Sequence, residues 1–291
     1  MTRFHLASIV PPPGDRSLLH GLYGYREVID ALHWGLDQLG HQVSVGQNSF
    51  RADHVNVVFG VQVLPHADLL RLPDDTIVYN FEQIGGLTID ELKPLIRTVA
   101  DRFRIWDYSE HNIETWQRVG AKRSVAHVPV GWAPVLRRIV SADPQDIDVL
   151  FYGSPSSERF AILTDLCNRG VKCIFVCGLY GSARDELIAR SKLVLNLNKH
   201  QSRIFEIVRV SYLLANAKAV VADRAPDSYV EPDMEDALAF ATRETIVATC
   251  ERLLDDRAAR EALEQRGLAA IERRPIAPPL AAALAKTGFP S

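Results

Sequence analysis

The chain alternates short apolar runs with amphipathic segments from one end to the other. Apolar runs of strand length occupy residues 1–10, 54–60, 76–83, 102–109 and 124–131, and then 147–154, 171–178, 192–198, 217–223 and 237–241. Between them, a periodicity of about 3.6 residues predicts helices over 26–39, 90–102, 111–120, 158–170, 183–191 and 242–255. Several of the apolar runs are continuous rather than alternating, which indicates parallel sheets covered on both faces.

The pattern is interrupted once, over residues 130–146, where Gly131, Pro134 and Pro144 occur. We therefore predict an α/β protein with two Rossmann-like, doubly wound parallel-sheet domains that face each other across a cleft. The domains are expected at residues 1–132 and 145–275, with a C-terminal tail at 276–291. Residues 262–274 predict a closing helix that Gly267 interrupts.

The segment 193–223 reads as a strand, a polar elbow, a helix over about 204–216 and a second strand. The helix is apolar almost all round, yet Arg203, Glu206 and Arg209 share one arc of its first two turns. Charges on a buried helix are costly unless they are paired or face a polar cavity, and a helix N-terminus suits an anion such as a diphosphate. A ligand site is one reading, and an Arg–Glu–Arg ion network between two helices is the other.

Two further strand ends of the second half carry polar residues. Gly153, Ser154 and Arg159 occupy a strand-to-helix turn, where amides, a hydroxyl and a guanidinium can bind phosphate oxygens. Ser156 or Ser157 could equally be a helix cap there. Beyond the next strand, Tyr180 stands between two glycines as a possible wall for a nucleotide base, and Asn198 lies shortly before the segment with the charged helix.

Three strand ends of the first half combine polar side chains with aromatic rings, a mixture that suits a sugar. The residues are His20, Gly21, Tyr23 and Gly24 after the first strand, Glu82 and Gln83 after residue 81, and Asp107, Tyr108 and Ser109 after residue 106. The alternatives are ordinary loop polarity and, for Ser109, capping of the following helix.

Composition narrows the class of protein. The 291 residues are 47% hydrophobic, and 33 basic against 36 acidic residues give a net charge of -3, which argues against nucleic acid as the main partner. The four cysteines lack the spacing of a metal site, and the histidines are scattered, so no metal is expected. With neither a signal peptide nor an integral membrane segment apparent, reduced thiols point to the cytoplasm.

Two such domains, a glycine-containing loop after the first strand and an acidic residue on a late helix resemble the GT-B glycosyltransferases. Residues 202–223, SRIFEIVRVSYLLANAKAVVAD, are similar to the segment in which RxFE leads a helix in small bacterial family 1 glycosyltransferases of the spore-maturation type. The retaining GT-B pattern has a second glutamate eight positions on, where this chain has Leu214. The stereochemical outcome is therefore open.

The resemblance implies a metal-independent, hexosyltransferase-type enzyme (EC 2.4) that needs no cofactor. Its donor would be a UDP- or GDP-linked sugar, and its acceptor a glycan, a lipid-linked glycan or a protein. Glu206 would bind a hydroxyl of the ribose or donor sugar, while Arg203 and Arg159 would neutralise the diphosphate, with Arg209 beside them.

An inverting transfer also requires a general base, for which the candidates are Glu82, Asp107 and His20 in that order. Acceptor contacts are expected from Gly21, Tyr23, Gly24, Gln83, Tyr108 and Ser109. The rival functions are a nucleotide-sugar epimerase on the same fold and a catalytically degenerate GT-B binding or scaffold subunit.

Overall fold

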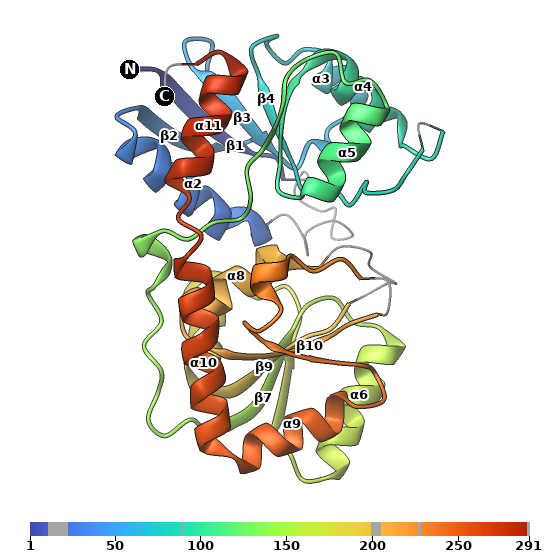
Figure 1. Cartoon of the computed structure of the whole chain (residues 1–291), viewed down its shortest axis with the longest axis vertical. Helices are drawn as coiled ribbons and strands as arrows, with labels where there is room; N and C mark the ends of the chain where they lie inside the picture. Colours follow the sequence, from blue (N-terminus) through green and yellow to red (C-terminus); the bar gives the residue numbers. More distant parts are fainter. Residues whose placement is uncertain (11–22, 89, 199–204, 226–227, 290–291) are drawn as a thin grey trace. The chain divides into compact units, whose positions relative to one another are not determined.

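The structure is a computed structural model that describes all residues except 11–22, 89, 199–204, 226–227 and 290–291, and except the side chain of Tyr23. The chain divides into two units (Figure 1). The first unit combines Met1–Ala133 with Pro275–Ser291, and the second unit is Pro134–Arg274. Each unit is built around its own parallel sheet, so the prediction of two Rossmann-like α/β domains is confirmed.

The first unit contains a six-stranded sheet in the order β2-β1-β3-β4-β5-β6, and all neighbouring strands are parallel. The strands are β1 (Arg3–Ser8), β2 (Gln42–Gln47), β3 (Val55–Phe59), β4 (Ile77–Asn80), β5 (Arg104–Asp107) and β6 (Val125–His127). Every residue of β3 and β4 is buried, which accounts for their largely apolar sequences, in which Asn56 and Asn80 are the exceptions. The edge strand β2 is partly exposed along its length and is accordingly more polar.

The helices of the first unit are α2 (Arg26–Gln38), α3 (His66–Leu69), α4 (Pro94–Arg102), α5 (Glu110–Arg118) and α11 (Ala277–Thr287), with 3-10 turns η1 (Tyr23–Tyr25) and η2 (Val61–Val63). α4 begins four residues later than the periodicity suggests. Pro94 occupies its first turn, where the missing N–H of proline leaves no intrahelical hydrogen bond unmade.

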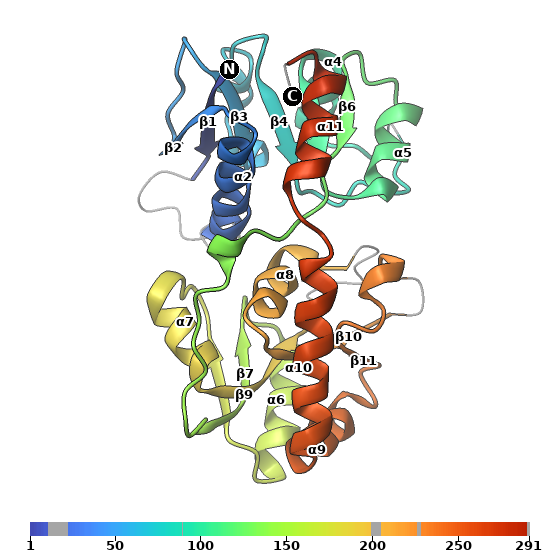
Figure 2. The ribbon, with the colours of Figure 1, turned by 60° about the vertical axis from the view of Figure 1, so that its left-hand side comes forward.

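The C-terminal residues, which the sequence presents as a tail, form α11 and pack in the first unit against α2 and β6 (Figures 1 and 2). Leu280 and Leu284 of α11 are fully buried. A Cβ atom at Gly35 of α2 would lie 2.7 Å from Cδ1 of Leu280, so glycine is what allows the two helices to approach this closely.

The second unit contains a five-stranded parallel sheet in the order β11-β10-β9-β7-β8. Its strands are β7 (Ile147–Tyr152), β8 (Cys173–Val176), β9 (Ser191–Asn196), β10 (Ala219–Asp223) and β11 (Ala239–Ala241). Its helices are α6 (Ser157–Asn168), α7 (Gly181–Arg190), α8 (Ile207–Ala215), α9 (Ile246–Asp255) and α10 (Arg257–Glu272), with 3-10 turns η3 (Pro134–Leu136) and η4 (Pro232–Met234).

The predicted closing helix is present as α10, and its 16 residues run through Gly267 without the expected interruption. A Cβ atom at Gly267 would lie 2.8 Å from both the Ala237 carbonyl oxygen and Cδ2 of Leu214 on α8. The glycine therefore permits close packing of α10 on α8, and this contact offsets its weak helix propensity.

Candidate functional site

Both sheets share one strand order, which locates a candidate ligand site in each. Counted from the first strand of each unit, the order runs 2-1-3-4-5, with β6 added at the end in the first unit. Such sheets bind ligands outside the carboxyl ends of the strands where the order reverses, between strands 1 and 3. In the first unit this point lies between β1 and β3, and in the second between β7 and β9.

In the second unit, Gly153 and Arg159 frame the turn after β7. Gly153 has φ 156°, and a Cβ atom there would lie 3.6 Å from both terminal nitrogens of Arg209. Arg159 is buried and donates hydrogen bonds to the Ser154 carbonyl (2.7 Å), to Ser154 Oγ (3.1 Å) and to the Leu197 carbonyl. Its guanidinium thus ties the end of β7 to the end of β9, while Arg209 faces the glycine.

The alternative role of Ser156 as a helix cap is confirmed. Its side chain accepts a hydrogen bond from the backbone N–H of Arg159 at 3.3 Å, at the start of α6. Tyr180 immediately precedes α7 and follows β8, one strand away from the β7–β9 switch point on the other side of β7. A contact between Tyr180 and a nucleotide base stays a prediction.

The end of β9 places buried amide groups at the same point. Asn196 is fully buried, and its Oδ1 atom accepts a hydrogen bond from Arg209 at 3.4 Å. Asn198 is held by Asp223 at the end of β10, through its backbone N–H (2.7 Å) and its Nδ2 atom (3.3 Å). Asn196 Nδ2 and Asn198 Oδ1 have no partner among the described residues. Buried polar atoms are rarely left without a hydrogen-bond partner, and a bound ligand would supply a partner to both of these atoms.

Glu206 and Arg209 form a pair at the start of α8, with 3.4 Å between Glu206 Oε2 and Arg209 Nη2. Both side chains are partly exposed, at 28% and 23%, so they can still reach a ligand. The Arg209 guanidinium also lies 5.6 Å from the centre of the Tyr152 ring, a contact that the sequence did not suggest.

α8 is shorter than predicted, because it begins at Ile207 and Glu206 is its N-cap residue. The preceding residue, Phe205, donates its N–H to the Tyr229 carbonyl at 3.0 Å and packs its ring 5.4 Å from that of Phe240. These contacts hold the chain outside the helix. The expected arc of three charges over two helical turns is therefore wrong for Glu206, and Arg203 lies outside the described residues.

In the first unit, Asp107 at the end of β5 is a fully buried hydrogen-bonding centre. Its two carboxylate oxygens accept hydrogen bonds from Asn80 Nδ2 (2.7 Å), Asn112 Nδ2 (3.0 Å), Trp116 Nε1 (2.8 Å) and the Ser109 N–H (3.0 Å). Trp116 is a partner that no strand-end pattern points to, because it lies nine residues further along, on α5.

The Asp107 network fixes the backbone that carries Glu82. Asn80 and Asn112 each donate an amide hydrogen bond to the Glu82 carbonyl, at 3.0 and 2.9 Å, and the Glu82 N–H donates to Asn80 Oδ1 at 3.2 Å. The Glu82 side chain itself is 32% exposed and lies 3.8 Å from Lys93 Nζ. The Glu82 side chain is therefore accessible to a ligand, whereas the buried Asp107 holds in place the residues that bind the Glu82 backbone.

The neighbouring acceptor candidates are brought to the same strand ends. Tyr108 is buried, and Phe81 stacks on its ring at 5.4 Å; Gln83 is exposed. Ser109 is the N-cap residue of α5, but its side chain makes no capping bond, and its buried Oγ has no partner in the described part of the chain. At Gly24 an added Cβ would meet nothing within 4 Å. His20, Gly21 and the Tyr23 side chain lie outside the described residues.

Replacing Asp107 with Asn is expected to flatten the pH dependence of stability between about pH 4 and pH 7. Burial raises the pKa of Asp107 to about 7 from 3.8, although its four hydrogen bonds act in the opposite direction. The folded protein then holds this proton more tightly than the unfolded chain. The stability that the protonated Asp107 gives the folded protein is fully present below about pH 4 and is lost as the pH rises through 7.

The measurement is urea unfolding of wild type and variant at several pH values. The unfolding free energy of wild type minus that of D107N should fall with a slope approaching about 1.4 kcal/mol per pH unit across this window. A difference that stays flat would show that the hydrogen bonds keep the carboxyl group ionised throughout.

Neither a membrane-spanning helix nor a cluster of metal ligands occurs in the described part of the chain. No helix there is long and apolar enough to cross a membrane. No group of three or more His, Cys, Asp or Glu side chains is placed to hold a metal ion.

Comparison with known sequences gives distant relatives. No protein-family model matches the chain. Acanthamoeba polyphaga mimivirus protein L140 is 26% identical over 196 residues, which is 65% of this chain and 62% of that protein. Mimivirus L137 is 29% identical over 148 residues, 48% of this chain and 19% of L137. The chain thus spans less than two thirds of the length of each of these relatives, and their viral source gives no support to a bacterial origin.

Comparison with solved structures identifies the fold. HepE from Anabaena, solved with UDP and glucose, has a TM-score of 0.61 at 12% identity, with 98% of this chain and 100% of that chain covered. WaaG, a glycosyltransferase involved in lipopolysaccharide biosynthesis, has a TM-score of 0.57 at 12% identity, with 99% and 100% covered. Sucrose-phosphate synthase from Thermosynechococcus elongatus has a TM-score of 0.58 at 11% identity, with 99% and 98% covered. The fold of this chain is that of the GT-B glycosyltransferases.

Proposed function

We propose that this protein is a glycosyltransferase that moves a sugar from a UDP- or GDP-linked donor to a hydroxyl group of an acceptor, without a metal ion. The acceptor would be a glycan, a lipid-linked glycan or a protein. The second unit would bind the donor and the first unit the acceptor. A cytoplasmic location stays the expectation drawn from the sequence.

One observation carries the proposal: the arrangement around Arg209 at the β7–β9 switch point. Arg209 faces the backbone of Gly153, pairs with Glu206 and contacts Asn196, whose Nδ2 atom has no partner among the described residues. A guanidinium beside a backbone segment without a side chain would suit a diphosphate, and amide atoms without partners would suit the sugar hydroxyls next to it. In support, HepE has been solved with UDP and with UDP-glucose.

The proposed chemistry depends on stabilising the leaving group. As the bond from the sugar to the nucleoside diphosphate breaks, negative charge grows on the phosphate oxygens while the sugar ring becomes oxocarbenium-like. Arg209 and the N-terminal amides of α8 would stabilise that charge. Glu206 would accept a hydrogen bond from a ribose or sugar hydroxyl. Arg159, whose terminal nitrogens are engaged by carbonyls, would hold the turn in place rather than bind the diphosphate directly.

On the acceptor side, Glu82 would be the general base of an inverting transfer, because its carboxylate is partly exposed on a loop whose backbone is held by three hydrogen bonds. Asp107, a second candidate from the sequence, is buried and engaged by four donors, so we assign it the role of positioning that loop. Gln83, which is exposed, would contact the acceptor, whereas Tyr108 and Ser109 are buried and would shape the site from within the fold.

The test begins with thermal unfolding in the presence of UDP, GDP, ADP and their sugar conjugates. A ligand at 100 times its Kd stabilises the folded state by about 2.7 kcal/mol, so a true donor should raise the Tm distinctly above unrelated nucleotides. The stabilising donor is then incubated with and without a panel of glycosides, with and without EDTA, and the products are resolved by mass spectrometry and NMR.

Each rival function has its own outcome in this experiment. Transfer that needs an acceptor and persists in EDTA supports the proposal. An isomeric nucleotide sugar formed without an acceptor would instead identify an epimerase. Tight nucleotide binding with neither transfer nor release of the sugar would identify a binding subunit.

A further inference from the structure

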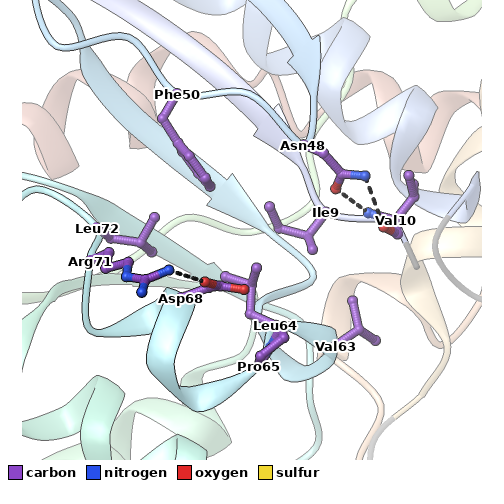
Figure 3. Close-up of a pocket in the computed structure, with 10 residues that line it drawn as sticks. All are labelled: Ile9, Val10, Asn48, Phe50, Val63, Leu64, Pro65, Asp68, Arg71 and Leu72. Atoms are coloured by element: carbon purple, nitrogen blue, oxygen red, sulfur yellow. Dashed lines mark hydrogen bonds and ion pairs between the residues drawn. The ribbon is translucent and has the colours of Figure 1, made fainter. Parts of the chain in front are cut away.

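The first unit contains a cavity that the proposed donor and base residues do not use. Its volume is about 510 Å³ (Figure 3). The lining residues are Ile9, Val10, Asn48, Phe50, Val63, Leu64, Pro65, Asp68, Arg71 and Leu72. This volume lies within the range of small-molecule sites, which run from about 300 to 1,000 Å³.

The cavity lies at the switch point of the first sheet. Ile9 and Val10 directly follow β1, Asn48 follows β2, and Val63 to Pro65 follow β3 through η2. These are carboxyl ends of parallel strands, and β1 and β3 are the pair between which the strand order reverses. Glu82, after β4, belongs to the next strand along the same edge of the sheet.

The wall of the cavity is apolar. Seven of its lining residues carry apolar side chains, and the polar groups of the other three are paired with protein. Asn48 accepts a hydrogen bond from the Val10 N–H at 2.9 Å and donates one to the Val10 carbonyl at 3.0 Å. Arg71 pairs with Asp68 at 3.1 Å (Figure 3). Asn48 has φ 47°, a left-handed conformation that asparagine adopts more readily than most residues other than glycine.

A sugar fits this wall poorly, because its hydroxyls would lose water without gaining partners. An alkyl chain or an aryl ring fits it well. Phe50, which is 40% exposed, adds an aromatic surface at the edge, and the Asp68–Arg71 pair is partly exposed to solvent, with side chains 48% and 79% accessible. An apolar interior beside a charged pair suits an amphipathic small molecule, with its apolar group inside and its polar part outside.

We propose that this cavity binds an apolar substituent of the acceptor, an alkyl or aryl group attached to the part that carries the reacting hydroxyl. That the ligand is an acceptor rests on the proposed function, but its binding to the cavity can be measured without any transfer. The natural substrate is then a glycoside or alcohol with a hydrophobic group, rather than a free sugar.

The experiment measures binding of methyl, n-hexyl and phenyl β-D-glucosides by isothermal titration calorimetry, in the absence of donor. Wild type should bind the hexyl or phenyl compound at least about tenfold more tightly than the methyl compound, since each apolar group removed from water strengthens binding. The variant Phe50→Ser should lose most of that preference, and Leu64→Trp, which fills the cavity, should abolish it.

Leu70→Ser is the matched control. Leu70 is 47% exposed, close to the value for Phe50, and belongs to the same unit, but it does not line the cavity. Its variant should keep the wild-type preference. Thermal unfolding of all variants checks that each one folds.

The failure of this inference is distinguishable from the failure of the proposed function. Equal affinity for all three glucosides, or equal loss in Phe50→Ser and Leu70→Ser, would overturn the inference even if transfer is observed. Binding to phosphatidylcholine vesicles that depends on Phe50, with no preference among glucosides, would overturn it in favour of a membrane contact. A preference that follows the cavity variants supports the inference even if no donor is found.

Discussion

Replacing Arg209 with Gln is expected to lower kcat/KM for the donor by about 10²- to 10³-fold, the size of effect seen when one group that stabilises developing charge is removed. The physical reason is the position of the guanidinium, 3.6 Å from the point where a Cβ of Gly153 would be, at the β7–β9 switch point. Such a loss corresponds to about 3–4 kcal/mol of transition-state stabilisation. Most of it should appear in kcat, because the charge on the leaving diphosphate grows as the bond breaks.

The measurement is steady-state kinetics with the donor identified by thermal shift. Arg190→Gln is the matched control: Arg190 also pairs with a carboxylate in the second unit, at 2.6 Å from Asp146, but it precedes β9 and so lies at the amino edge of the sheet. The control should stay within about threefold of wild type. If Arg209→Gln does the same, Arg209 does not act on the leaving group, and the proposed site loses its central residue.

A substitution at Glu206 tests the other partner of the Glu206–Arg209 pair. Glu206→Gln keeps a hydrogen-bonding side chain but removes the charge that faces Arg209 at 3.4 Å. If Glu206 binds a hydroxyl group, the Gln variant should raise KM more than it lowers kcat. A fall confined to kcat would instead show that its charge matters for the chemical step.

Replacing Arg159 with Met is expected to destabilise the second unit by about 3 kcal/mol, because a buried guanidinium with three hydrogen bonds is removed and its acceptors are left without partners. The acceptors are the Ser154 carbonyl and hydroxyl and the Leu197 carbonyl. Met retains much of the side-chain volume, so packing against the Phe151 ring, 5.2 Å from the guanidinium carbon, is largely preserved. The effect therefore reports on the hydrogen bonds.

Arg169→Met is the control for this change. Arg169 directly follows α6, on which Arg159 lies, and it pairs with Asp165 and Glu251 in a partly exposed position. Exposed ion pairs contribute at most about 1 kcal/mol, so its loss should be small. Urea unfolding monitored by hydrogen exchange resolves the second unit from the first. Equal destabilisation by the two changes would refute the idea that Arg159 ties β7 to β9.

The sequence predicts the role of a residue correctly where that role follows from the residue's own neighbourhood in the chain. Most of the apolar runs became buried parallel strands, although β8 is only partly buried, and Ser156 became a cap because a serine before a helix can bond its first amides. The sequence is a poorer guide where a distant segment decides the outcome. α8 starts at Ile207 because Tyr229 and Phe240 hold Phe205 outside it, and α10 passes through Gly267 because Leu214 packs against it.

The candidate site shows the same division. The strand ends that carry Gly153, Asn198, Glu82 and Asp107 could be found from the pattern alone. That Asp107 lies beneath the Glu82 loop could not, because two of its partners, Asn80 and Trp116, come from β4 and α5 and their approach depends on strand order. The apolar cavity was equally out of reach, since its wall is assembled from the segments after β1, β2 and β3.

The sequence by itself determined the class of this protein: two α/β units with polar residues at the carboxyl ends of parallel strands. It could do so because strand burial and helix periodicity are properties of neighbouring residues. Only the tertiary structure decided which of those polar side chains are partly exposed, as Glu82 is, and which are buried, as Asp107 is. That distinction depends on strand order and on side chains distant in the chain, because burial and pairing are set by whatever the fold brings alongside.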